Sequence, residues 1–297
     1  MKLTAPRWLS DNFGTWLLSF ILAVTVWVAA TVNGEDCVGL AWQYLVRERG
    51  LRPEAVVIAM PSHLGVCYGQ RGRMEVEIAT SGVSTHGSQP DRGHNAIYAM
   101  QPVIDGISRL HSELKVEHPM LGLGSLAVTG ISSRSPSLTA IPDQCVIHVD
   151  RRLTIGESPE DALAQLQALV KPAAGEAGDG EVRLLHYDLP SWRGFTYPTD
   201  KVFPAWITPS ASAAVVAGMM TAERVLDRKP RIHRSAFSSN GCATAGMFDI
   251  PTIGFGPADE LHSHSVNDQI PLAQLRPAMA FYGMYPQVYL ESVSAEE

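Results

Sequence analysis

Two histidines near the end of the sequence, His262 and His264, have a spacing that could serve metal chemistry. Side chains two residues apart point to the same side of an extended segment, so both imidazoles could donate to one ion. Catalytic zinc normally has three protein ligands and a water, so this pair would need a further donor. The alternative is a loop on which both histidines face solvent. The spacing therefore indicates a candidate metal site and leaves both interpretations open.

Seven short strings in the sequence resemble the motifs of one enzyme family. They are Gly69-Gln-Arg-Gly-Arg-Met-Glu75, Gly82-Val-Ser-Thr-His-Gly-Ser-Gln-Pro90, Gly93-His-Asn-Ala-Ile97, Asp150-Arg-Arg-Leu153, Phe237-Ser-Ser-Asn-Gly241, Gly254-Phe-Gly-Pro257 and His264-Ser-Val-Asn-Asp268. The family is the group of dinuclear zinc hydrolases that includes acetylornithine deacetylase, succinyl-diaminopimelate desuccinylase and glutamate carboxypeptidase. The first string and the segment Glu35–Tyr44 are most similar to the hydrolases linked to selenium metabolism. The resemblance runs from about Glu35 to the C-terminus.

This resemblance implies both a fold and a reaction. The fold is an α/β catalytic domain that holds two zinc ions, with an inserted ferredoxin-like (βαββαβ) lid that also forms a homodimer. The reaction is metal-assisted amide hydrolysis, in which a glutamate deprotonates a zinc-bound water and a histidine helps the metal to stabilise the oxyanion. The implied substrates are N-acyl amino acids or small peptides with a free carboxylate, and the family is cytoplasmic.

Four positions match family residues that act on the substrate. His86 matches the lid histidine that reaches the active site of a partner subunit and meets the oxyanion; alternatively, it caps a turn. Arg152 matches the arginine that pairs with the substrate carboxylate, a bidentate fit of two planar groups, although it could be an ordinary cation on a strand. Asn240 and Gly241 match an active-site loop and are equally well explained as a turn.

The metal positions match the family only in part. Glu35 and His264 match two ligands of one zinc, and His262 could add a third donor. Gly34 stands where the family has its general-base glutamate, and Met60 stands where it has another carboxylate ligand; a thioether is a poor zinc donor. The family's first His-x-Asp motif and its bridging aspartate have no counterpart. We therefore expect weak or absent zinc binding and impaired hydrolysis. The alternative is an inactive, truncated or fused homologue that retains only the lid for dimerisation and binding.

Composition limits the possible classes of protein. The chain has 297 residues, of which 45% are hydrophobic and 18% charged, and its net charge is −7. This length suggests about two domains, and the acidic balance argues against a nucleic-acid-binding face. The high apolar content argues against disorder. The four cysteines form no Cys-x-x-Cys pair, so we expect core thiols rather than a zinc module or a disulfide scaffold. They are Cys37, Cys67, Cys145 and Cys242.

Apolar periodicity predicts a complete small domain within residues 69–189. Alternation over 73–80 predicts a half-buried strand, and apolar residues at helical spacing predict a helix over about 95–114. Strands at 125–131 and 145–153, a helix that begins at Ser158 and a strand at 181–189 complete the pattern. This order is that of the ferredoxin-like split βαβ unit.

The flanking segments, 34–68 and 190–297, predict a partial α/β catalytic domain. A helix over 35–49 precedes an apolar strand at 55–59, which has the composition of a strand buried on both faces. A second apolar strand is predicted at 252–255. Helices are predicted at about 210–226 and 272–290.

Residues 1–33 differ from the rest of the sequence. The 23 residues from Asn12 to Gly34 carry no charge, and as a helix they would span roughly 34 Å, enough to cross a hydrocarbon core. The segment resembles the membrane-anchoring start of bacterial YbbR-like proteins. A cleaved signal peptide and a buried helix are the alternatives. We expect a membrane anchor if this segment is native.

Overall fold

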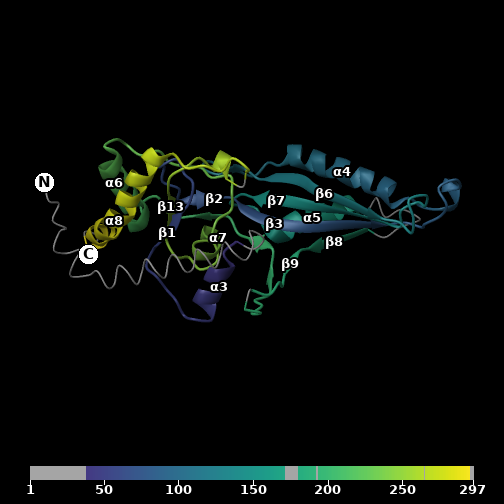
Figure 1. Cartoon of the computed structure of the whole chain (residues 1–297), viewed down its shortest axis with the longest axis horizontal. Coiled ribbons are helices and arrows are strands. Elements are labelled where there is room, and N and C mark those ends of the chain that lie inside the picture. The colour runs from purple at the N-terminus through teal and green to yellow at the C-terminus, as the bar shows by residue number, and fades with distance from the viewer. Residues whose placement is uncertain (1–37, 171–179, 192, 264, 295–297) are drawn as a thin grey trace.

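The computed structural model describes residues 38–170, 180–191, 193–263 and 265–294. They form an elongated molecule with a long antiparallel sheet and two helices at one end, and two parallel strands with two helices at the other (Figure 1). The helices and strands are, in chain order, α3 (Leu40–Arg47), β1 (Val56–Ala59), β2 (Gly69–Gln70), β3 (Gly72–Ser81), η1 (Pro90–Arg92), α4 (Ala96–Glu113), β4 (Glu117–His118), β5 (Gly122–Leu123), β6 (Ser125–Arg134), β7 (Gln144–Leu153), α5 (Pro159–Val170), β8 (Gly180–Leu184), β9 (His186–Tyr187), β10 (Thr199–Asp200), β11 (Val202–Phe203), β12 (Trp206–Ile207), α6 (Ala213–Leu226), α7 (Gly241–Thr244), β13 (Thr252–Phe255), η2 (Glu260–His262) and α8 (Leu272–Ser294).

Residues 72–184, which we call the four-stranded unit, follow the order predicted from the sequence: strand, helix, strand, strand, helix, strand. The four strands lie side by side in the order β8-β3-β7-β6, and every neighbouring pair is antiparallel. A small additional hairpin, β4–β5, precedes β6. Strand β7 alternates strictly between buried and half-buried residues, because one face of the sheet lies under helices α4 and α5.

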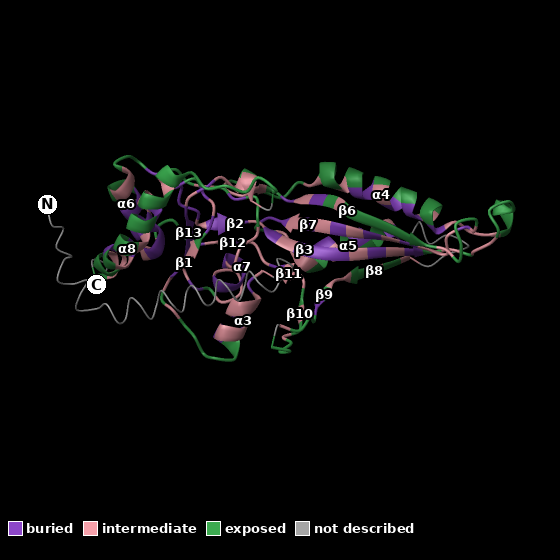
Figure 2. Ribbon diagram, viewed as in Figure 1, coloured by how far each residue is buried: buried purple, intermediate pink, exposed green. Residues whose placement is uncertain are grey.

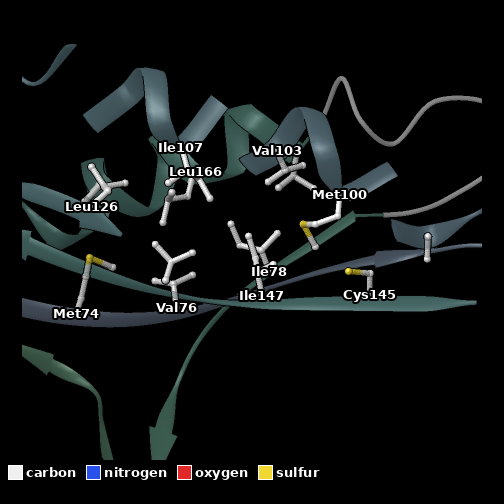
Figure 3. Packing of buried hydrophobic residues seen from close by; sticks show 14 of the residues in the cluster. Met74, Val76, Ile78, Met100, Val103, Ile107, Leu126, Cys145, Ile147 and Leu166 are labelled. Atoms are coloured by element: carbon white, nitrogen blue, oxygen red, sulfur yellow. The ribbon is translucent and has the colours of Figure 1, made fainter. Parts of the chain in front are cut away.

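The core of the four-stranded unit lies between this face and the two helices (Figure 3). Met74, Val76 and Ile78 of β3 point toward the helix side of the core, where Met100 and Val103 of α4 also lie. All five side chains are essentially inaccessible to solvent. Burial of apolar side chains is the main source of stability available to a unit of this size. The opposite face of the sheet carries charged and polar side chains, and no described helix covers it. Figure 2 shows how buried and less buried residues alternate along these strands.

Helices α4 and α5 begin where side chains satisfy free backbone N–H groups. Asn95 accepts a hydrogen bond from the N–H of Ile97 at 2.9 Å, and Ser158 accepts one from Asp161 at 3.0 Å. Glu160 and Asp161 in the first turn of α5 favour its positive end. The helix start that the sequence predicts at Ser158 is therefore confirmed.

The other half of the molecule is built on β1 and β13, and we call it the β1–β13 half. The two strands are parallel, with Val56 opposite Thr252 and Ala59 opposite Phe255. Helices α6 and α8 pack together beside them, and Phe255 stacks on Phe281 of α8. Both strands match their predicted ranges to within one residue.

Two short antiparallel strand pairs connect the halves. Strand β2 pairs with β12, and the start of β3 pairs with β11. The sequence does not predict these two-residue strands, since they are too short for any periodicity. It also predicts one strand over 181–189, whereas β8 ends at Leu184 and β9 pairs separately with β10.

The predicted apolar helix over residues 1–33 lies outside the described residues, as does Cys37. Among the residues that the structure describes, no helix is both long and apolar enough to cross a membrane.

Candidate functional site

The carboxyl ends of β1 and β13 form the first candidate region, because ligands of open α/β sheets bind where parallel strands end. Two loops leave these ends and are joined by hydrogen bonds from His63 N to Ala258 O (2.7 Å) and from Leu64 N to Gly256 O (2.9 Å). His63, Leu64 and Ala258 all have positive φ angles, of 50°, 60° and 69°. Such conformations are costly for residues other than glycine and gather at functional sites.

Met60 directly follows β1, at the position where the family has a carboxylate ligand. Its side chain packs on Gly254, where a Cβ would lie 2.2 Å from the Met60 sulfur. Met60 is buried and fills the space against β13 as an apolar residue. Its role in the described structure is packing.

Glu260 and His233, which the sequence did not indicate, form a hydrogen-bonded pair beside these loops. The His233 Nε2 lies 3.2 Å from a Glu260 carboxylate oxygen, and the N–H of Ala236 donates to the other oxygen at 3.3 Å. Partial burial acts to raise the pKa of Glu260, but hydrogen bonds from His233, Ser235 and Ala236 outweigh it and lower that pKa below 4.5. The ionised Glu260 carboxylate therefore links the loop after β13 to residues 233–236, and we call this contact the Glu260 clamp.

The two residues assigned to metal binding, Glu35 and His264, lie outside the described residues. His262 is described and ends η2, within the loop that Glu260 holds. Across the described ranges, no group of three or more His, Cys, Asp or Glu side chains is arranged to hold a metal. The described donors alone do not fit a zinc site, and we derive no catalytic step through zinc.

Asn240 and Gly241 stand where the chain enters α7. The side-chain oxygen of Asn240 accepts a hydrogen bond from the N–H of Gly39 at 3.0 Å, which fixes the start of α3. A Cβ on Gly241 would lie 2.3 Å from the indole ring of Trp206, so only glycine fits there. Both residues thus have structural contacts, and their role in substrate binding remains a prediction.

Arg152 lies near the end of β7, on the helix-free face of the sheet and beside the β1–β13 half. Its Nε and Nη2 donate to the two carboxylate oxygens of Asp150 at 2.6 and 2.9 Å. This bidentate pair occupies one edge of the guanidinium and leaves Nη1 for another acceptor.

His86 lies at the other end of the sheet, where its backbone bridges to Ala140 in the loop between β6 and β7. The N–H of Ser88 lies 3.2 Å from its Nδ1, and the Ser88 Oγ lies 2.8 Å from the same nitrogen. The ring is exposed, and a cavity of about 610 Å³ opens beside Gly87 and Leu138. Eight residues of β7 separate Arg152 from Gln144, which is about 26 Å of strand. One chain therefore does not bring His86 and Arg152 together.

The three described cysteines are buried, as the sequence predicts. Burial raises the pKa of the Cys67 thiol to about 11, and the thiol donates a hydrogen bond to the carbonyl of Gly69 at 3.3 Å. A thiol with this pKa is not a nucleophile at neutral pH. We assign Cys67 to the core.

Comparison with known proteins gives one matched domain and several relatives. Residues 68–178 match the peptidase dimerisation domain of the M20 family. The chain is 41% identical over 266 residues to the protein YgeY of Escherichia coli (strain K12), a match that covers 90% of this chain and 65% of YgeY. It is 24% identical over 270 residues to the acetylornithine deacetylase of Proteus mirabilis (strain HI4320), covering 87% of this chain and 62% of the enzyme.

Among solved structures, the M20 family metallo-carboxypeptidase Sso-CP2 from Sulfolobus solfataricus has a similar fold. The TM-score is 0.60 at 16% identity, over 83% of this chain and 66% of the other. The chain spans less than two thirds of the length of the two curated relatives. Residues 68–178 are thus similar to the M20 dimerisation domain, and the chain as a whole is similar in sequence to these relatives and in fold to an M20 metallo-carboxypeptidase.

Proposed function

We propose that this chain is an amidohydrolase or peptidase of the M20 type that cleaves the amide bond of N-acyl amino acids or small peptides. The observation that carries this proposal is the matched dimerisation domain, which lies within a fold similar to that of a metallo-carboxypeptidase. Arg152 would bind the free carboxylate of the substrate, and His86 would donate its Nε2 proton to the oxyanion. Asn240 and Gly241 would line the same site.

We infer that residues 69–189 form the lid, a ferredoxin-like unit, and that it makes a homodimer. The strand β6 supports this inference, since its outer edge pairs with no other described strand and its side chains are exposed from Thr129 to Arg134. An open edge of this length favours pairing with a second strand. Dimerisation also gives His86 a role, because it lies too far from Arg152 of its own chain.

Zinc is the cofactor that the family implies, and it would have to be held by Glu35 and His264. Met60 offers a thioether in place of a carboxylate, and Gly34 offers no general base. General-base assistance is worth about 10²–10⁴-fold in rate, so we expect slow turnover even with metal present. The variants Met60→Glu and Gly34→Glu should raise zinc affinity and turnover, respectively.

Hydrolysis of N-acetyl amino acids in the presence of added zinc tests the proposal. We expect slow release of acetate by the unmodified chain and none by His86→Asn. The matched control is His186→Asn, which removes an exposed histidine paired only with Asp200. A folded dimer with zinc present and no detectable hydrolysis would instead favour the second candidate, an inactive homologue that keeps only the lid.

A further inference from the structure

Three arginines gather on the helix-free face where the four-stranded unit meets the β1–β13 half. Arg73 of β3 and Arg152 of β7 are directly opposite one another. Arg71 precedes Arg73 by two residues in an extended segment and therefore lies on the same face. Its place diagonal to Arg152 puts the two backbones about 7–8 Å apart, within reach of long side chains.

Among the residues that the structure describes, two carboxylates pair with the cations at this place. Glu75 forms an ion pair with Arg73 (2.6 Å) and accepts a hydrogen bond from Lys201 at 3.0 Å, and Arg73 also lies over the ring of Phe203. Asp150 is engaged bidentately by Arg152. Four cations, including Arg71, thus face two anions, in a protein whose net charge is −7. The local charge is opposite in sign to that of the whole chain.

Arg71 is the cation without a carboxylate partner among the described residues. Its Nη1 donates to the carbonyl of Leu123 at 3.0 Å, which leaves Nε and Nη2 for another acceptor. Partial burial lowers the pKa of Arg71, and the positive charge of Arg152 lowers it further, against a smaller opposite effect of Asp150. An anion bound between the two guanidinium groups would relieve this repulsion.

We propose that Arg71 binds the substrate carboxylate together with the free Nη1 of Arg152, while Asp150 holds Arg152 in place. This inference rests on the proposed function, and it assigns the main carboxylate contact to Arg71. A carboxylate fits two guanidinium groups because each offers planar, charge-assisted donors. Arg71 also lies between β2 and β3, where the β1–β13 half connects to the four-stranded unit. A ligand bound at Arg71 would therefore contact both halves of the molecule.

Binding of N-acetylglycine to the full chain, titrated by NMR with a metal chelator present, tests the proposal. The neutral N-acetylglycinamide is the matched ligand control, and inorganic phosphate tests whether the site takes any anion. We expect Arg71→Gln to weaken binding of N-acetylglycine at least about tenfold, and Arg71→Lys to lose less. Asp150→Asn should weaken binding less than Arg71→Gln does, because it loosens Arg152 but leaves both guanidinium groups in place.

The matched protein control is Arg109→Gln, an exposed arginine of α4 far from this face. It should leave binding unchanged, and unfolding midpoints should show that every variant is folded. Binding by Arg71→Gln within twofold of the unmodified chain would overturn the proposal, as would equal binding of the neutral amide or tighter binding of phosphate.

The test separates this inference from the proposed function, because binding is measured without metal or turnover. An inactive chain that binds N-acetylglycine through Arg71 would refute the hydrolase function and leave the carboxylate site. An active chain whose KM is unchanged in Arg71→Gln would refute only the carboxylate site.

Discussion

The buried ion pair between Arg151 and Glu157 should govern the stability of the four-stranded unit. Arg151 is 1% exposed and lies on the opposite face of β7 from Asp150 and Arg152, so it anchors the strand end that presents them. It donates to Glu157 and to the carbonyl of Arg152 at 2.7 Å, and Glu157 also accepts from the N–H of Thr154 at 2.9 Å.

Glu157→Gln leaves the Arg151 charge buried without a counter-ion. Breaking a buried pair on one side costs about 3–5 kcal/mol, which is a large part of the free energy of unfolding of a domain. The expected fall in Tm is about 4 °C per kcal/mol, or about 12–20 °C, for a unit of this size. Urea unfolding followed by circular dichroism, with hydrogen exchange of β7 amides, would measure it.

The double variant Arg151→Met/Glu157→Leu should recover much of the loss, because it removes both charges and leaves an apolar pair. Glu160→Gln, an exposed acid in the first turn of the same helix, is the matched control and should change stability by only a few tenths of a kcal/mol. A loss of less than about 1 kcal/mol of unfolding free energy in Glu157→Gln would contradict this prediction, as would a double variant that is no more stable than the single variant.

Three further predictions concern the dimer edge, the Glu260 clamp and Cys67. Ile131→Lys on β6 should shift the chain to monomer in sedimentation equilibrium, because it places like charges across the paired edge. Leu138→Lys, in the loop beyond this edge, should leave the dimer intact. If both variants remain dimers, the β6 edge is not the dimer interface. Folding lowers the pKa of Glu260, so the ionised carboxylate stabilises the folded chain at pH values above its unfolded pKa, and this stabilisation is lost as the pH falls through its folded pKa. Glu260→Gln should therefore flatten the decline of the unfolding free energy below pH 4.5. An unaltered decline would contradict the stabilising role of Glu260. Cys67, with a pKa of about 11, should resist thiol reagents at pH 8 until the chain unfolds, and rapid labelling of the native chain would show that it is accessible.

Much of the fold follows from local patterns in the sequence. The alternation of apolar and polar residues in β3 and β7 predicts strands with one face buried under the helices. The helical spacing of apolar residues in α4 predicts which face of this helix covers the strands. The capping sequence at Ser158 specifies the start of α5 without reference to any distant residue. These signals are local, and the order of elements in the four-stranded unit could therefore be read from the sequence.

The contacts of the candidate site depend on long-range packing, and the sequence could not supply them. Glu260 meets His233, and Asn240 meets Gly39, only after separate segments have come together at the ends of β1 and β13. The short strands β2, β11 and β12 form for the same reason, since two residues carry no periodicity.

The residues near Arg152 show most clearly which properties follow from the sequence and which depend on the tertiary structure. The sequence indicated Arg152 as a cation for a carboxylate by its resemblance to a family motif, but could not show that Asp150 already occupies one edge of it. It contained Arg71 in the string Gly69–Glu75 without distinguishing it from Arg73. Residue type determined that these side chains are cations. Strand register decided which carboxylate each one meets, and it left Arg71 without one because charge pairing is a property of neighbours in space.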